Sequence, residues 1–365
     1  MPFQIIQGNI LDCRCDAVVN PSDELFSGSG GLDRQIHLAA GPELREECRA
    51  LGRLEIGRAA LTGAYGLPCR AVIHTVAPCW KGRDEELERL RDCYRNSLRL
   101  ALENNLSDLA FPLIGAGTRG FPRETVLAVA AEELKRFLAE HDECTIRLVV
   151  HDREEFRPNR RLLDGLESYR RTLRTNAIFD EPSFYGASVP MARPKESARE
   201  ERASEEEARP RKSSARGIFP SFRRRAESAK PEAAPAPCAA PEPIFSTERL
   251  VLDESFSEMV MRKIDEEGFK RDSECYSRAN IDRRLFSKIR SDVHYHPKKT
   301  TAVALAVALE LNLNETKELL EKAGYTLSHS ILFDVIVEYC ILQKNYDIFE
   351  INELLFQYDQ PLLGG

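Results

Sequence analysis

The feature that most constrains the fold is the alternation of short apolar runs with longer amphipathic stretches over residues 1–172. The apolar runs contain many β-branched residues, as expected for buried strands, and they read FQII, DAVVN, AVIHTVAP, LAFPLIG and TIRLVVHD. Stretches with helical periodicity lie between several of these runs, at Leu32–Leu51, Asp84–Asn104 and Pro122–Glu140. This order predicts an α/β domain whose mostly parallel or mixed sheet is covered by helices on both faces.

The composition changes abruptly after this region. Residues 173–252 are rich in proline, alanine, serine and charged residues, and they contain few large apolar side chains. A segment of this kind buries too little apolar surface to offset the conformational entropy that folding removes. We therefore predict a disordered linker over residues 173–252.

The third region, residues 253–365, nearly lacks glycine and is helical in pattern. Apolar positions recur three and four residues apart in five segments, which are Met259–Ile264, Cys275–Ala279, Arg284–Ile289, Thr301–Glu310 and Glu315–Lys322. We expect Asn314 to start the last of these helices and Gly324 to end it. The sequence predicts a small all-α domain.

Charge and cysteine usage exclude several classes of protein. The net charge of −7 does not mark the whole chain as a nucleic-acid binder. The ten cysteines include no pair of CxxC motifs, so a structural zinc site is not expected. We also expect no cofactor. The start of the chain does not read as a signal peptide, and the most apolar run, Ala302–Leu309, is too short to span a bilayer. We expect a cytoplasmic protein.

Two glycine-rich segments carry the chemistry of the first region. They are Ser27–Asp33, which reads SGSGGLD, and Ile114–Pro122, which reads IGAGTRGFP. Each one follows a predicted strand and precedes a predicted helix. Glycine lets the backbone approach a phosphate closely, and the first N–H groups of a helix point at an anion. Two such loops on one sheet indicate a ligand with at least two phosphates.

With these loops in place, the first region resembles the macro domain family. The resemblance extends through QGNI at 7–10, DAVVNPSD at 16–23, SGSGGLDRQIHLAAG at 27–41, GRAALTGAYGLPCRAVIHTVAP at 57–78 and LAFPLIGAGTRGFP at 109–122. It implies a three-layer α/β/α domain with a cleft at the carboxyl ends of the strands. The ligand it implies is ADP-ribose, free or attached to a protein.

The resemblance also implies roles for single residues. Asn9 and Ile10 would lie beside the adenine, while Asn20 and Asp33 would lie at the distal ribose. The diphosphate contacts would come from backbone groups of Gly30, Gly31 and Leu32 and from the phosphate loop, whose residues are Ile114, Gly115, Ala116, Gly117, Thr118, Arg119, Gly120 and Phe121.

The family includes proteins that only bind ADP-ribose and proteins that resemble hydrolases. The hydrolases remove ADP-ribose from acidic side chains or split O-acetyl-ADP-ribose. In a hydrolytic protein Asp33 would position and activate water, with Asn20 and Asp23 as further catalytic candidates. Two functions remain open. The chain is either an ADP-ribosyl hydrolase or O-acetyl-ADP-ribose deacetylase, or it is a non-catalytic sensor of ADP-ribose.

Three residues depart from the family pattern. Asn9 stands where an aspartate usually accepts a bond from the adenine amine, and Asp23 replaces the second asparagine of the usual NAAN run. Arg119 stands in the phosphate loop where hydrolytic members usually have an aromatic or aliphatic residue. These departures favour recognition of ADP-ribose over turnover.

The run DSECYSRANIDRRLFSKIRSD, residues 272–292, predicts a helix, a tight turn at Asn280 and a second helix. Residues 256–324 resemble the phage-repressor-like helix-turn-helix family. Residues 270–299 hold nine lysines and arginines against four acidic residues, although residues 253–365 carry fourteen against twenty. The candidates for nucleic-acid contact are Arg283, Arg284, Ser287, Lys288 and Arg290. This face would either read DNA or dock a protein partner.

Overall fold

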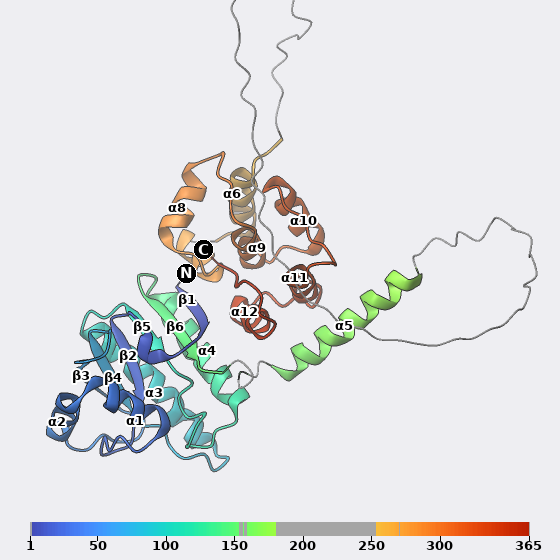
Figure 1. The fold of residues 1–365 in the computed structure, drawn as a ribbon. Helices are drawn as coiled ribbons and strands as arrows, with labels where there is room; N and C mark the ends of the chain where they lie inside the picture. Colours follow the sequence, from blue (N-terminus) through green and yellow to red (C-terminus); the bar gives the residue numbers. More distant parts are fainter. Residues whose placement is uncertain (1, 153–155, 157–158, 180–252, 270, 365) are drawn as a thin grey trace, which may run out of the picture. The chain divides into compact units, whose positions relative to one another are not determined.

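The computed structural model describes residues 2–152, 156, 159–179, 253–269 and 271–364. Met1–Glu181 and Leu252–Gly365 cluster into one compact unit (Figure 1). The linker predicted for residues 173–252 lies outside the described residues from residue 180 onward.

The described residues of the first region form a six-stranded sheet with the order β1-β6-β5-β2-β4-β3. The strands are β1 (Phe3–Gln7), β2 (Ala17–Pro21), β3 (Ala59–Gly63), β4 (Ala71–Thr75), β5 (Asp108–Phe111) and β6 (Thr145–Val150). Neighbouring strands run parallel except β3, which pairs antiparallel to β4. The predicted mixed sheet is confirmed.

Helices cover both faces of this sheet, as Figure 1 shows. They are α1 (Gly31–Ala40), α2 (Pro42–Leu51), α3 (Asp84–Glu103) and α4 (Arg123–Glu140). Successive strand residues point to opposite faces, so Val18 packs in the core that contains α1 and α2 residues. Ala17 and Val19 pack in the larger core that contains α3 and α4 residues.

Two details differ from the sequence prediction. The stretch predicted as one helix over Leu32–Leu51 is two helices, because Gly41 takes a φ of 99° and Pro42 begins α2. A left-handed glycine ends a helix, and proline at the first position starts the next one. The short strand β3 was not predicted, since its sequence AALTG has small residues, a glycine and only one β-branched residue, Thr62.

The third region is all-α, as predicted. Its helices are α6 (Phe256–Glu267), α7 (Asp272–Arg278), α8 (Arg283–Ser291), α9 (Lys299–Ala308), α10 (Leu313–Lys322), α11 (Leu332–Leu342) and α12 (Ile348–Gln357). Asn280 takes the predicted positive φ, at 51°, in the turn between α7 and α8. The cap of α10 is Asn312 rather than Asn314: its side chain accepts from the Glu315 amide, and Glu315 bonds back. None of the described helices is long and apolar enough to cross a membrane.

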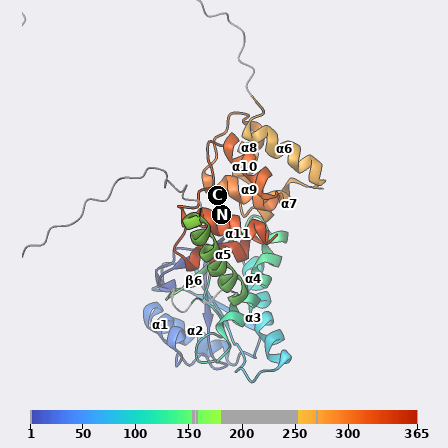
Figure 2. The same ribbon diagram turned by 90° about the vertical axis from the view of Figure 1, so that its right-hand side faces the viewer.

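A helix that follows the sheet, α5 (Arg160–Phe179), packs on α11 of the all-α region (Figure 2). The Tyr169 hydroxyl donates to Glu338 at 3.2 Å, and the rings of Tyr169 and Tyr339 lie 5.7 Å apart. The edge strand β1 also meets this region, because the Phe3 and Phe349 rings lie 4.6 Å apart. The first and third regions therefore share one core.

Candidate functional site

The first glycine-rich segment forms a loop over residues 22–30 that leads from β2 into α1. Gly28 takes a φ of 65°, which glycine adopts without strain, and folds the loop against the following helix. The N–H groups of Gly31, Leu32 and Asp33 open that helix and have no protein acceptor within the described part of the chain. Such N–H groups, at the positive end of the helix dipole, favour an anion.

The second segment, the phosphate loop, joins β5 to α4. Gly115 takes a φ of 92°, and the Phe121 N–H donates to its carbonyl at 3.3 Å, which closes the loop on itself. Among the described residues, the N–H groups of Gly117, Thr118 and Arg119 find no protein acceptor. The loop thus presents a second set of donors to an anion.

The flanks of the phosphate loop have structural contacts. The Ile114 side chain is buried in the core, and its N–H donates to the Tyr94 hydroxyl at 3.2 Å. Phe121 is buried with its ring 4.8 Å from that of Trp80. Gly120 is exposed with a φ of 76°. These predicted ligand-binding residues shape the loop, and the open donors lie between them.

A hollow of about 330 Å³ lies between the two loops. Its lining combines backbone-rich residues of both loops with residues that follow β1, β5 and β6: Gly8, Asn9, Ile10, Gly31, Leu32, Gln35, Pro112, Leu113, Ala116, Gly117, Arg123, Val149, Val150 and His151. Sequence reasoning missed eight of these residues, which are Gly8, Gln35, Pro112, Leu113, Arg123, Val149, Val150 and His151. Six of them lie at or just after the carboxyl ends of the parallel strands β1, β5 and β6, where ligands of open α/β sheets bind, so that rule could have found them.

Asn9 lines this hollow and also caps a short 3₁₀ turn. Its Oδ1 accepts from the Leu11 N–H at 3.1 Å, so one acceptor site of the side chain is already used. Ile10 is buried beside it. Both residues line the hollow, and their contact with an adenine stays a prediction.

Asn20 and Asp33 meet in a buried polar network. The Asn20 amide donates to Asp33 Oδ1 at 2.7 Å and to His74 Nδ1 at 3.1 Å. The other ring nitrogen of His74 lies 2.9 Å from the Thr62 hydroxyl. Burial, with His37 nearby, lowers the pKa of His74 to about 3, so this ring is neutral and one nitrogen accepts while the other donates. The Asn20 amide is therefore fixed in orientation.

Two acceptors of the network have no donor among the residues that the structure describes: Asn20 Oδ1 and Asp33 Oδ2. Asp33 is only 2% exposed, and burial raises the pKa of its carboxyl, although Asn20 and His37 act in the opposite direction. The His37 ring nitrogen Nε2 lies 3.5 Å from Asp33 Oδ1. Buried acceptors without donors call for a hydroxyl or a water molecule.

Asp23 organises its own loop. Its Oδ1 accepts from the N–H groups of Leu25 at 2.9 Å and Ser27 at 3.0 Å, and its Oδ2 accepts from the hydroxyls of Ser27 and Ser29. Burial alone would raise the pKa of Asp23, but the hydrogen bonds from Ser27, Leu25 and Ser29 lower it below its ordinary value. Asp23 and Asp33 are thus not bonded to each other, and they differ in environment.

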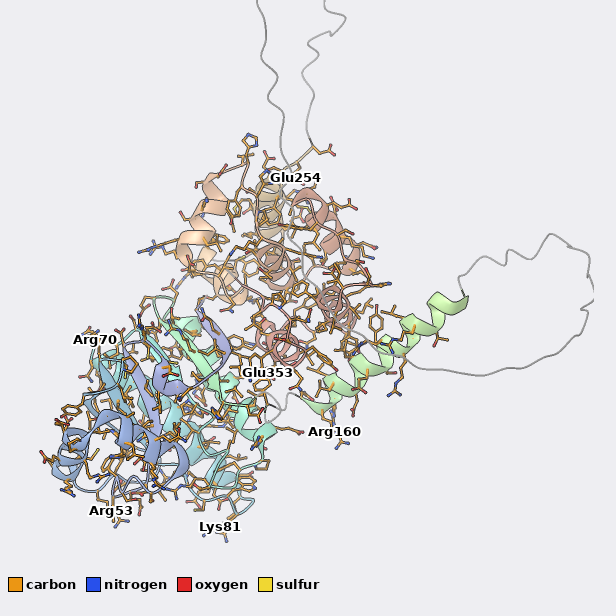
Figure 3. The ribbon with its side chains drawn as sticks, in the orientation of Figure 1. Arg53, Arg70, Lys81, Arg160, Glu254 and Glu353 are labelled. Atoms are coloured by element: carbon orange, nitrogen blue, oxygen red, sulfur yellow. The ribbon has the colours of Figure 1, made fainter. Side chains whose placement is uncertain are left out.

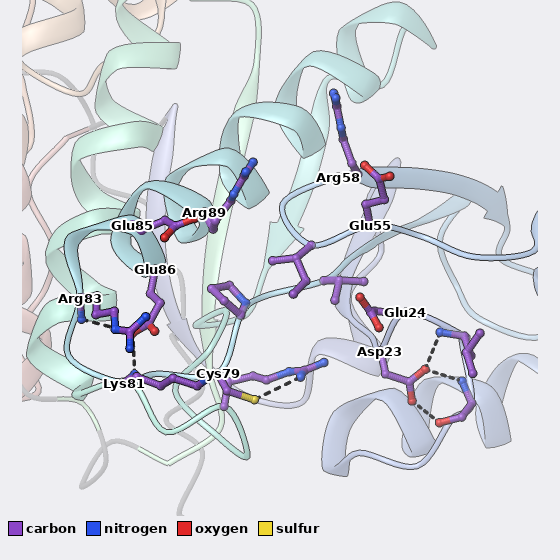
Figure 4. Close-up of a pocket in the computed structure, with 16 residues that line it drawn as sticks. Asp23, Glu24, Glu55, Arg58, Cys79, Lys81, Arg83, Glu85, Glu86 and Arg89 are labelled. Atoms are coloured by element: carbon purple, nitrogen blue, oxygen red, sulfur yellow. Dashed lines mark hydrogen bonds between the residues drawn. The ribbon is translucent and has the colours of Figure 1, made fainter.

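A second, wider hollow of about 940 Å³ begins at Asp23 (Figure 4). Figure 4 shows Lys81, Arg83 and Glu86 on one side and Asp23 and Glu24 on the other. Arg119 of the phosphate loop also lines it, so the loop contributes to both hollows.

The predicted nucleic-acid residues lie on α8. Phe286 and Ile289 are buried, whereas Arg283, Arg284, Ser287, Lys288 and Arg290 are exposed. Arg290 pairs with Asp272, and the Lys288 ammonium lies 5.3 Å from the centre of the Tyr295 ring. No group of histidine, cysteine, aspartate and glutamate that could hold a metal ion occurs among the described residues.

These observations define an α/β domain with a cleft at the carboxyl ends of parallel strands, on which two loops present open N–H groups. The comparisons with known proteins agree with this class. The family model described as "Macro domain" matches residues 19–130. A macro domain-containing protein of Methanosarcina mazei is 39% identical over 166 residues, which make up 45% of this chain and 89% of that protein. The chain belongs to the macro domain family.

Other relatives carry names of activities. The O-acetyl-ADP-ribose deacetylase of Escherichia fergusonii is 41% identical over 167 residues, 44% of this chain and 94% of that protein. The ADP-ribose glycohydrolase MACROD1 of Bos taurus is 40% identical over 150 residues, 40% of this chain and 46% of that protein. A solved Oceanobacillus iheyensis macrodomain with ADP is 31% identical, with a TM-score of 0.41 over 48% of this chain and 91% of that one.

Proposed function

We propose that this chain binds ADP-ribose in the cleft between the two glycine-rich loops. The observation that carries the proposal is the pair of open donor sets, at 31–33 and at 117–119, on the two loops that line one hollow. Two donor sets suit the two phosphates of a diphosphate. The names of two relatives, an O-acetyl-ADP-ribose deacetylase and an ADP-ribose glycohydrolase, support the choice of ligand.

The two ends of the ligand find different surroundings. Asn9 and Ile10 lie at the end of the smaller hollow, where the adenine is proposed to bind. The distal ribose is proposed to bind toward Asn20 and Asp33, because each has a buried acceptor without a donor and the ribose hydroxyls can donate.

Calorimetric titration of the full chain with ADP-ribose tests binding. We expect a saturable, one-to-one interaction. Gly31→Pro should weaken it strongly, because proline removes one of the backbone N–H donors of the loop. An absence of heat and of thermal stabilisation by ADP-ribose would contradict the proposal.

Hydrolysis of an ester of ADP-ribose is the second candidate function. Asp33 favours it, because its carboxyl is buried, burial raises its pKa, and its Oδ2 has no donor among the described residues and can accept a proton from water. The deacetylase and glycohydrolase names of close relatives point the same way. The rival is a sensor that binds ADP-ribose without turnover.

The substitution Asp33→Asn separates the two. An asparagine at position 33 still accepts from the Asn20 amide but cannot take a proton, so we expect turnover of O-acetyl-ADP-ribose to fall roughly a hundredfold or more while ADP-ribose binding is nearly kept. Asp84→Asn, in the first turn of α3, is the matched control. Tight ADP-ribose binding by the wild type without turnover would contradict hydrolysis and support the sensor.

The exposed face of α8 supports a further proposal for the all-α region, which is contact with DNA or with an acidic protein partner. Arg283, Arg284 and Lys288 form no ion pair within the described ranges of the chain. Assignment to the helix-turn-helix family stays a prediction. Salt-sensitive binding of duplex DNA, lost in Arg284→Ala/Lys288→Ala, is the expected result, and failure to bind DNA at low salt would favour a protein partner.

A further inference from the structure

Arg119 is the residue of the phosphate loop that lines the wider hollow. Its loop neighbours Ala116 and Gly117 line the smaller hollow, while Arg119 itself lines the wider one. Its backbone is fixed, because the Trp80 N–H donates to the Arg119 carbonyl at 2.8 Å. The phosphate loop therefore holds Arg119 in a defined position beside the wider hollow.

The guanidinium bridges the two walls of the cleft through weak acceptors. Nη2 donates to the Ser22 carbonyl at 3.4 Å, and Nη1 donates to Cys79 Sγ at 3.5 Å, the bond drawn at Cys79 in Figure 4. The distance to the Ser22 carbonyl is long for a hydrogen bond from a charged donor, and a thiol sulfur is a weak acceptor. A carbonyl and a thiol also leave the positive charge without a counter-charge.

The neighbouring carboxylates are engaged elsewhere. Both oxygens of Asp23 accept bonds from its own loop, and Glu24 pairs with Arg53 at 3.0 Å. Within the residues that the structure describes, Arg119 forms no ion pair. A half-buried guanidinium with weak partners and no counter-charge is suited to an anion that enters the wider hollow.

We propose that Arg119 binds the carboxyl group that is esterified to the distal ribose, which makes it a substrate-specificity residue for carboxylate esters of ADP-ribose. This rests on the proposed function. In hydrolysis the oxygen of water adds to the acyl carbon, and the bond from that carbon to the ribose oxygen breaks. The ribose oxygen keeps the electron pair and takes a proton, so the products are ADP-ribose and a carboxylic acid that ionises at neutral pH.

The negative charge in this step appears on the acyl side of the bond, in the wider hollow. A guanidinium stabilises two carboxylate oxygens at once through paired N–H donors, which a neutral side chain cannot do. Arg119 would then distinguish esters, whose acyl part becomes an anion, from linkages whose second product is a neutral alcohol. The positive charge of this loop position would contribute little to the adenosine end, which lies in the other hollow.

Binding of the two products tests the inference without turnover. The ADP-ribose dissociation constant of the full chain is measured by calorimetry in sodium acetate and in sodium chloride at equal ionic strength. We expect acetate to tighten ADP-ribose by about threefold or more in the wild type, since coupling between two ligands is reciprocal. Arg119→Gln should abolish this effect, Arg119→Lys should keep part of it, and the control Arg99→Gln, in an exposed ion pair on α3 outside both hollows, should behave as wild type.

Kinetics on O-acetyl-ADP-ribose give the second measurement. Loss of a charge-assisted bond predicts a kcat/KM about ten- to a hundredfold lower in Arg119→Gln, with ADP-ribose affinity nearly unchanged. Equal loss of affinity and of turnover would overturn the inference, because the guanidinium would then act on the diphosphate. ADP-ribose binding without any acetate effect removes this inference alone, whereas no ADP-ribose binding by the wild type removes the proposed function with it.

Discussion

Glu353 is a buried acid that the proposed function does not use. It lies on α12 and is labelled in Figure 3. The residue is 7% exposed and lines a hollow to which α3 and α4 also contribute. Burial, with Glu350 and Asp347 nearby, raises its pKa to about 8. The carboxyl is therefore largely protonated in the folded chain at neutral pH, whereas an unfolded glutamate has a pKa of about 4.3.

The first prediction follows from this difference. The folded state holds a proton that the unfolded state releases, so Glu353 destabilises the fold progressively as pH rises from about 4.5 to about 8, and the loss then levels off. Glu353→Gln should match the wild type near pH 5 and exceed it by a few kcal/mol at pH 8.5. Thermal unfolding across this range measures the gap. A gap that does not change with pH would contradict the prediction.

At the scale of one glycine, the phosphate loop allows a second prediction. A Cβ at Gly115 would lie 3.0 Å from the Phe121 ring, and the φ of 92° is unfavourable for any other residue. Gly115→Ala should therefore shift the loop and weaken ADP-ribose binding about tenfold, since strain of this kind costs about 1–3 kcal/mol. Gly52→Ala, at a φ of 79° outside the cleft, is the control for strain alone. Equal ADP-ribose affinities of Gly115→Ala and the wild type, measured by calorimetry, would contradict this prediction.

At the scale of elements, the contact between α5 and α11 depends on one small residue. A Cβ at Gly165 would overlap the hydroxyl oxygen of Tyr339. In an isolated helix alanine stabilises the helix by about 1 kcal/mol relative to glycine. The sign of the stability change in Gly165→Ala therefore distinguishes the effect of packing from that of helix propensity.

We predict that Gly165→Ala destabilises the chain by about 1–3 kcal/mol because overpacking exceeds the gain in propensity. The second substitution Tyr339→Phe removes the overlapping oxygen and leaves the ring carbon Cζ at 3.1 Å, so the double variant should recover part of the loss. Chemical denaturation of the two single variants and the double variant gives the coupling. A stabilised Gly165→Ala would show that α5 does not pack on α11 in solution.

Much of the element order could be predicted from the sequence, because buried strands and amphipathic helices have distinct periods. The break at Gly41 was missed since apolar spacing continues across it. The positive φ at Asn280 was predicted from residue type alone. The surroundings of the site residues could not be predicted, since they depend on distant partners: Asp33 is buried beside Asn20 and His74, and Asp23 accepts bonds from its own loop.

At the scale of the whole molecule, the all-α region completes the edge of the sheet. β1 is an edge strand, and an exposed edge leaves backbone groups unpaired. The Asn280 side chain satisfies those of Phe3: its Oδ1 accepts from the Phe3 N–H at 2.9 Å, and its amide donates to the Phe3 carbonyl at 2.9 Å and to the Leu363 carbonyl at 3.3 Å. One side chain thus pairs with Phe3 as a residue of a neighbouring strand would.

Asn280→Gly isolates this role, because glycine accepts the φ of 51° and loses only the side-chain bonds. Phe3 would keep two buried backbone groups without partners, so we expect a loss of about 2–4 kcal/mol and a melting temperature roughly 5–10 °C lower. Asn105→Gly, at a φ of 56° and exposed at the end of α3, is the matched control and should melt as wild type.

Calorimetry should also show one transition in the wild type and a broader or divided one in Asn280→Gly, because the sheet and the all-α region share this contact. Equal melting of both variants would mean that the two regions fold independently, and that the edge of β1 is satisfied by water.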